Sequence, residues 1–238
     1  SGLLKPSRPR MNMVLSSRAE EVVARLLNFY KRTWRHSSND PFRSLVGTIL
    51  SQNTNGRNRS TAQTRLEEMI GITPDSLATA PLEDIIEAIR PAGMYNQRSK
   101  VLKNVSKEIL ERFQGSLDQV MKKPFSQARK DLMSLPGVGP KTADVTLMFA
   151  TGSNIVPVDR HIFRISQRLG VVPLNATYDK VRLTLEAATA LDRRQDIHVF
   201  LIRFGREICK SRNPRCYICL LEDLCLYSSK YLNTGNDD

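Results

Sequence analysis

The chain has 238 residues, of which 40% are hydrophobic and 25% charged, a composition typical of a folded globular protein and not of a disordered one. No apolar run reaches the roughly 18 residues that a membrane span needs, and the first ten residues lack the apolar stretch of a secretory signal, so we expect a soluble intracellular protein without a membrane partner. Thirty-six Lys and Arg residues against 24 Asp and Glu give a formal charge of +12, which favours nucleic acid as a partner, although charge alone leaves a basic protein that binds none equally open.

Apolar residues recur at helical spacing along most of the chain, and sustained two-residue alternation is almost absent, so an all-α fold is predicted. The first helix is expected to open at Ser17, where Glu20 completes a capping box, and to end near Arg35. Asp40 and Pro41 supply an N-cap and a first-turn proline for a second, wholly buried helix. Further helices are predicted over residues 59–70, 82–90, 97–113, 127–134, 141–150, 160–169, 178–190 and 196–208.

Two glycines lie between two of these helices, in the stretch Leu135-Pro136-Gly137-Val138-Gly139-Pro140-Lys141. Glycine permits a tight turn and close backbone approach, and the amides at the start of the next helix attract phosphate. By itself, such a stretch also suits a simple helix connector. Lys141 changes this interpretation, because the positive end of a helix dipole disfavours a charged lysine and favours the neutral, nucleophilic amine.

The stretch resembles the helix-hairpin-helix of the DNA glycosylase superfamily whose motif ends in Gly, Pro and a catalytic Asp. Downstream, Val156-Pro157-Val158-Asp159-Arg160-His161 is similar to the superfamily's catalytic-aspartate segment. The resemblance implies that Lys141 is the nucleophile, that Asp159 is its carboxylate partner, and that Gly137, Val138 and Gly139 contact DNA.

Each of these residues also has a simpler interpretation. Asp159 alone reads as a helix N-cap, a role that is compatible with catalysis. His36, His161 and His198 are expected to be structural or surface groups and not catalysts.

All four cysteines lie late in the chain, with the spacing Cys209-x6-Cys216-x2-Cys219-x5-Cys225. Crowded cysteines indicate a shared metal and not a disulfide framework, and the spacing alone leaves both zinc and a [4Fe–4S] cluster open. The spacing resembles that of the endonuclease III family of DNA glycosylase/AP lyases, which implies a [4Fe–4S] cluster. Lys210, Arg212 and Arg215 lie in the loop between the first two cysteines, where we expect phosphate contacts in preference to a merely solvated loop.

Two further segments resemble parts of the same family that fill the space left when a nucleotide is flipped from the duplex. The first, Ile49-Leu50-Ser51-Gln52-Asn53-Thr54, implies gap filling by Gln52 and Asn53, with Asn53 at a position that is usually Gln. The second, Gly93-Met94-Tyr95-Asn96, implies that Met94 wedges into the opposite strand, whereas Met and Tyr at a helix junction alone would favour a core position. The family's acidic residue soon after the gap-filling segment is Gly56 here, which leaves the preferred lesion open.

The resemblance covers about residues 20–228 and implies two helical domains: a six-helix domain over 39–153 with the helix-hairpin-helix, and an iron–sulfur domain over 17–38 and 154–228. Residues 1–16 and 229–238 are expected to be flexible tails. The implied function is a bifunctional DNA glycosylase and AP lyase that removes oxidised pyrimidines from duplex DNA and also cleaves abasic sites. A related glycosylase for alkylated purines, 8-oxoguanine or mismatched bases, and a non-catalytic DNA-binding module, are the alternatives. We expect a monomer, in the cytoplasm or nucleoid of a prokaryote or in the nucleus or mitochondrion of a eukaryote.

Overall fold

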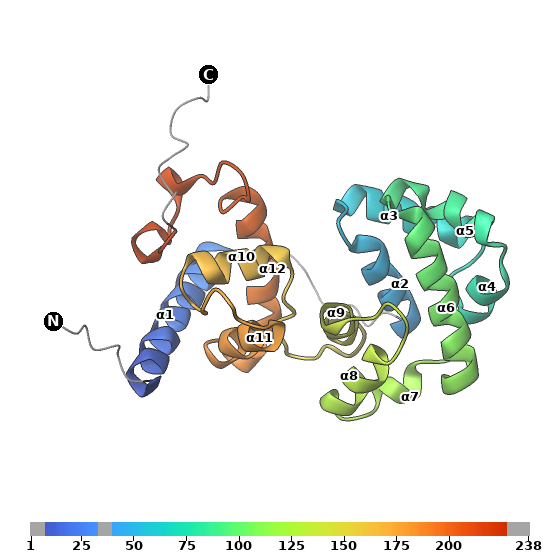
Figure 1. Cartoon of the computed structure of the whole chain (residues 1–238), viewed down its shortest axis with the longest axis horizontal. Helices are drawn as coiled ribbons and strands as arrows, with labels where there is room; N and C mark the ends of the chain where they lie inside the picture. Colours follow the sequence, from blue (N-terminus) through green and yellow to red (C-terminus); the bar gives the residue numbers. More distant parts are fainter. Residues whose placement is uncertain (1–7, 33–39, 228–238) are drawn as a thin grey trace, which may run out of the picture. The chain divides into compact units, whose positions relative to one another are not determined.

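The computed structural model describes residues 8–32 and 40–227 (Figure 1). Within these ranges the chain forms twelve α-helices, four short 3₁₀ helices and no strand, which confirms the predicted all-α class. The chain divides into two compact units. Arg35–Ser153 form the inserted unit, and Ser1–Trp34 together with Asn154–Asp238 form the terminal unit.

The inserted unit is built around α2, which packs against α3 and α9, while α6 packs against α4 and α5. On α2, Leu45, Val46, Ile49 and Leu50 are at most 1% exposed, so this helix is buried as predicted. Burial of each such side chain contributes about 1.5–3 kcal/mol. The helices of this unit are α2 (Pro41–Ser51), α3 (Gly56–Met69), α4 (Pro74–Thr79), α5 (Leu82–Ile89), η1 (Arg90–Ala92), α6 (Tyr95–Phe113), α7 (Asp118–Met121), α8 (Phe125–Met133) and α9 (Pro140–Thr151).

Local capping explains where several of these helices begin. The Asp40 carboxylate accepts a hydrogen bond from the Arg43 N–H at 2.8 Å, as expected for an N-cap. The Asn55 side chain caps α3 in the same way, so α3 begins at Gly56 and not at residue 59. The predicted helices omitted the short helices α4 and α7, although Thr73 and Pro74 give α4 the same cap-and-proline signal as α2.

The terminal unit joins a helix from the start of the chain to helices from its second half. α1 packs against α12 and α11, and α10 packs against α12. Its core includes Val22, Val23 and Leu26 of α1 and the fully buried Phe200 and Phe204 of α12. The helices are α1 (Arg8–Phe29), α10 (Arg160–Arg168), α11 (Tyr178–Ala187), η2 (Leu191–Arg193), α12 (Arg194–Glu207), η3 (Cys216–Ile218) and η4 (Glu222–Leu224).

The bounds predicted for the first helix are wrong. α1 begins at Arg8, because nothing between Met11 and Ser17 interrupts a helix and Pro9 lies in the first turn, where proline is tolerated. Residues 8–16, predicted as part of a tail, are therefore helical. The helix ends at Phe29, and the predicted end near Arg35, like residues 1–7 and 228–238, lies outside the described residues. None of the described helices has the length and apolar character required to cross a membrane.

Candidate functional site

The glycine-rich stretch forms a turn between α8 and α9 in the inserted unit. Leu135 and Val138 are buried in the core, while Gly137 and Gly139 are exposed. The Val138 N–H donates to Leu135 O at 3.2 Å, and among the described backbone hydrogen bonds none is donated by the N–H of either glycine. The turn thus leaves the N–H groups of two exposed glycines outside these backbone hydrogen bonds, while the Val138 side chain is buried, so Val138 would contact a ligand through its backbone.

The two glycines have different structural roles. Gly137 has φ +74°, and a Cβ placed there would lie 2.8 Å from Val101 Cγ1 on α6. At Gly139 a Cβ would meet no atom within 4 Å, and this residue begins α9 without a side-chain cap. Gly137 is therefore required by the turn, whereas Gly139 leaves the first turn of α9 open to a ligand.

Lys141 is the second residue of α9 and is half-buried. The next residue, Thr142, accepts a hydrogen bond from Gln52 Nε2 at 3.2 Å. This contact brings the predicted gap-filling segment against the helix of the predicted nucleophile, across 90 positions of sequence. The hairpin is further held by a buried ion pair, in which Arg129 Nε of α8 lies 2.7 Å from a carboxylate oxygen of the fully buried Asp144 of α9.

The predicted gap-filling segment and the predicted wedge segment each place a polar or flexible side chain on backbone with positive φ. Asn53, just after α2, has φ +53° and is exposed, and Met94 has φ +49° and a side chain that is 50% exposed. Core packing is therefore not the role of Met94. Tyr95 differs, because it packs against the core of the inserted unit.

Asp159 in the terminal unit is the N-cap of α10. Its carboxylate accepts a hydrogen bond from the Ile162 N–H at 2.9 Å, so the simpler interpretation of this residue is correct. The preceding residues 155–158 are all buried. This cap uses one of the roughly four lone-pair sites of an ionised carboxylate, so most of its acceptor capacity lies outside the cap.

Three side chains fix the segment that leads into Asp159. Glu186 accepts from the Val156 N–H at 3.1 Å, and the Tyr178 hydroxyl accepts from the Val158 N–H at 3.2 Å. His198, buried on α12, has Nδ1 2.8 Å from Pro157 O. Because a carbonyl only accepts, His198 carries its proton on Nδ1 in this contact.

Of the other two histidines, only His161 lies among the described residues. His161 is half-buried with Nδ1 3.1 Å from Arg164 Nη2, and burial lowers its pKa below the usual value. A Cβ at Gly205 would approach His161 Cβ to 2.8 Å, so α10 and α12 are in close contact there. His36 lies outside the described residues.

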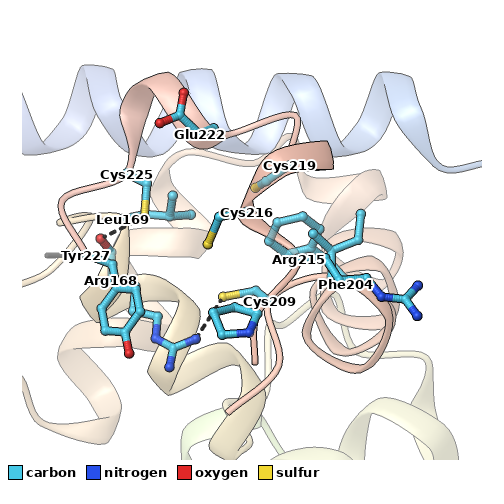
Figure 2. Close-up of a pocket in the computed structure, with 12 residues that line it drawn as sticks. Arg168, Leu169, Phe204, Cys209, Arg215, Cys216, Cys219, Glu222, Cys225 and Tyr227 are labelled. Atoms are coloured by element: carbon cyan, nitrogen blue, oxygen red, sulfur yellow. Dashed lines mark hydrogen bonds between the residues drawn. The ribbon is translucent and has the colours of Figure 1, made fainter. Parts of the chain in front are cut away.

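The four cysteines of the terminal unit line one cavity of about 390 Å³, counted with its part open to solvent. Figure 2 shows Cys209, Cys216, Cys219 and Cys225 with their sulfur atoms around a common space. The lining also includes the apolar side chains of Leu169, Phe204 and Ile208. An all-sulfur donor set of four in a partly apolar cavity fits an iron–sulfur cluster.

In the described part of the chain, no three His, Cys, Asp or Glu side chains are arranged to hold a single metal ion. Burial raises the pKa of the Cys219 thiol to about 11. A bound cation would reverse this effect, because coordination deprotonates a thiol.

Arginines hold the cysteine-bearing segment to the helices around it, and Figure 2 shows one of them, Arg168, beside Cys209. Arg168 at the end of α10 donates to Lys210 O at 2.7 Å and lies 3.5 Å from Cys209 Sγ, and its own carbonyl accepts from the Leu226 N–H. On α1, Arg25 pairs with Asp223 at 2.7 Å.

Two more arginines make similar contacts. Arg18 donates to Leu224 O at 2.5 Å, and Arg164 donates to Cys209 O at 2.8 Å. The segment is thus tied down through its backbone at several places.

The basic residues of the same segment differ in exposure. Arg212 and Arg215 are exposed, whereas Lys210 is half-buried. Their backbone is held by the contacts of Arg168 and by a bond from the Arg215 N–H to Ile208 O at 3.0 Å. Two of the three predicted phosphate-binding side chains are therefore exposed.

Comparisons with known proteins agree on one relationship. The model of the HhH-GPD superfamily of base excision DNA repair proteins matches residues 46–190. The chain is 34% identical over 206 residues to endonuclease III of Thermotoga maritima, covering 87% of this chain and 91% of that one. It is 31% identical over 211 residues to endonuclease III of Escherichia coli K12, covering 88% of this chain and 95% of that one.

Solved structures show the same relationship. A trapped endonuclease III–DNA covalent intermediate matches with a TM-score of 0.77 and 27% identity, over 88% of this chain and 95% of that chain. A thermostable thymine-DNA glycosylase shares the fold, with a TM-score of 0.67 and 23% identity, over 94% of this chain and 100% of that one.

Proposed function

The chain belongs to the HhH-GPD superfamily of base excision DNA repair proteins, and we propose that it is a bifunctional glycosylase and AP lyase that removes oxidised pyrimidines from duplex DNA. Membership in the family makes it a DNA glycosylase of base excision repair. The observation that carries the lyase step is Lys141 in the first turn of α9, directly after a turn with exposed glycine amides. The relatives named endonuclease III support the choice of substrate class.

Binding begins at the turn between α8 and α9. The exposed amides of Gly137 and Gly139 and the positive end of α9 suit a backbone phosphate, and such contacts carry no base sequence information. Arg212 and Arg215 add a second, salt-sensitive set of phosphate contacts. The partner is double-stranded DNA with a damaged base or an abasic site, bound by one copy of the chain.

The target nucleotide then leaves the stack, which costs a few kcal/mol of lost stacking and pairing. Asn53 and Gln52 occupy the vacated position, and Met94 enters the opposite strand. Gln52 is held beside the nucleophile's helix by its bond to Thr142, which couples filling of the gap to the position of α9.

The chemistry starts with a neutral Lys141 amine attacking C1′. The C1′–N bond breaks, the base leaves with the bonding electrons and takes up a proton, and a new C1′–Nζ bond forms. Asp159 stabilises positive charge on the sugar and accepts a proton from the amine. The C1′–O4′ bond then breaks, O4′ leaves with the bonding electrons and takes up a proton, and the open sugar carries a C1′=Nζ iminium.

The iminium acidifies the C2′ proton, and its removal is followed by breakage of the C3′–O bond, so the 3′ phosphate leaves. Water then hydrolyses the imine and regenerates Lys141. The lyase step therefore needs the lysine, whereas base loss alone could be achieved without it.

Cys209, Cys216, Cys219 and Cys225 would hold a [4Fe–4S] cluster, whose contribution is to cross-link residues 209–225 to one another. The arginine contacts of α1 and α10 fix the same segment from outside, so Arg212 and Arg215 are held on an ordered loop. The cluster takes no part in the lysine chemistry.

The test is borohydride trapping on duplexes that contain thymine glycol, 5-hydroxycytosine, 8-oxoguanine, a thymine–guanine mismatch or an abasic site. Lys141→Ala is compared with Lys130→Ala, which removes a lysine side chain from an exposed site on α8. We expect trapping on oxidised pyrimidines that is lost only in Lys141→Ala. Trapping on another lesion alone would overturn the substrate class, and no trapping even at the abasic site would overturn the lysine assignment.

A further inference from the structure

Arg98 on α6 is a buried cation beside the loop that carries Met94. Its side chain is 3% exposed, and burial lowers the pKa of its guanidinium. Among the described residues, no carboxylate forms a salt bridge with it, and its Nε has no hydrogen-bond partner. A buried charge of this kind is unfavourable unless other dipoles compensate it.

The compensation comes from the loop itself. Arg98 Nη1 donates to Ala92 O at 2.6 Å and to Gly93 O at 3.0 Å, and Nη2 lies 3.9 Å from Met94 Sδ. Ala92 ends the helical run formed by α5 and η1, where backbone carbonyls carry partial negative charge. One guanidinium therefore contacts three successive residues of the loop.

Those contacts act on backbone that is unfavourable for its sequence. Gly93 has φ +73° and ψ 173°, a region that glycine alone adopts readily, and Met94 follows with φ +49° and ψ 28°. A methionine rarely adopts positive φ, so the surroundings must hold it there. Its side chain is half exposed, so burial of that side chain does not account for this conformation.

We propose that Arg98 is a positioning residue that fixes the Met94 loop so that the methionine side chain is presented to the duplex. This inference rests on the proposed function, in which Met94 enters the strand opposite the lesion. Packing alone would need no charge at this place, because an apolar side chain of similar length would fill the same volume. The guanidinium carries several N–H donors in a fixed planar fork, so one side chain can contact two carbonyls and a thioether at the same time.

The experiment measures the fluorescence of 2-aminopurine placed opposite a tetrahydrofuran abasic analogue, at saturating protein, so it depends on neither catalysis nor affinity. The variants are Met94→Ala, Arg98→Met and the double variant. Lys107→Met serves as the control, since it removes an exposed charge from the same helix. Arg98→Lys keeps the charge but not the fork, and it provides the test if Arg98→Met does not fold.

We expect the wild type and Lys107→Met to raise the fluorescence equally, and Arg98→Met to lose most of that increase. Arg98→Lys should lose part of it. In the Met94→Ala background, neither Arg98 variant should cause a further loss, because Arg98 acts through Met94.

The inference would be overturned if Arg98→Met raised the fluorescence as much as the wild type does. It would also be overturned if Arg98→Met lost the same fraction of the increase with Met94 as with Met94→Ala. An unchanged signal in the wild type would overturn it as well, since there would then be no inserted side chain to position. Trapping activity measured on the same wild-type preparation reports separately on the proposed function.

Discussion

Replacement of Gly137 by alanine should destabilise the inserted unit, whereas the same change at Gly139 should not. A non-glycine residue at φ +74° costs about 1–2 kcal/mol. The new Cβ would also lie 2.8 Å from Val101 Cγ1, well inside contact distance, and crowding of a packed core costs about 1–3 kcal/mol. Together these effects predict that Gly137→Ala lowers the free energy of unfolding by about 2–5 kcal/mol, a large share of the 5–15 kcal/mol of a typical domain.

Gly139→Ala provides the matched comparison, because its Cβ would meet nothing within 4 Å and its φ is −92°. We expect its free energy of unfolding to change by no more than about 1 kcal/mol. Its methyl group would instead stand at the open start of α9. Loss of a phosphate contact there should weaken DNA binding about tenfold or more.

Urea unfolding followed by circular dichroism measures the first effect, and fluorescence anisotropy with a labelled duplex at several salt concentrations measures the second. Val101→Ala in the Gly137→Ala background should recover the crowding part of the loss but not the part due to φ. Equal stability of the two alanine variants would refute the assignment of Gly137 to the turn. Wild-type DNA affinity in Gly139→Ala would refute the open end of α9 as a phosphate site.

Asp159→Asn should leave stability within about 1 kcal/mol, because asparagine also caps helices, while base release falls about 100-fold or more through loss of the charge; thermal unfolding and single-turnover kinetics test both. Burial depresses the pKa of His161 below 6.5, with Arg164, Arg160 and Arg206 acting in the same direction and Asp159 opposing. Its contribution to stability is therefore fully present above about pH 6.5 and is lost as the pH falls through the lowered folded-state pKa, so His161→Gln should flatten melting temperature against pH in that window. Cys216→Ser should reduce the iron bound per chain and the visible absorbance, while the urea concentration at which the inserted unit (α2–α9) unfolds stays the same. Unchanged iron content would contradict the ligand assignment.

The sequence predicted elements best where a strong cap preceded a long apolar repeat. Asp40 and Pro41 located α2 in this way, and buried residues at helical spacing located its core face. The same logic missed α4, since six residues give too short a repeat to recognise, and it placed the start of the first helix at a cap-like pair that lies inside α1. Local signals identify possible ends, and tertiary packing decides which are used.

For the candidate site, motif spacing pointed to the candidate residues but could not predict which other residues hold them in place. The four cysteines do line one cavity, as their crowding in the sequence suggested. The bond from Gln52 to Thr142 joins residues 90 positions apart, which no local pattern encodes. Arg98 in an amphipathic helix reads as a surface cation, and only its 3% exposure reveals otherwise. His198 was predicted to be structural or at the surface, and it is structural.

The terminal unit is made of two chain segments separated by the whole inserted unit, and this has a consequence for biosynthesis. The inserted unit contains all of its own helices in one continuous stretch, so it can fold once residue 153 has emerged from the ribosome. α1, by contrast, must wait on the ribosome until α11 and α12 exist before it can bury Val22 and Leu26. The cysteines and the Asp223 partner of Arg25 arrive later still, so any cluster bound by these cysteines would be assembled last, after the turn between α8 and α9 has formed.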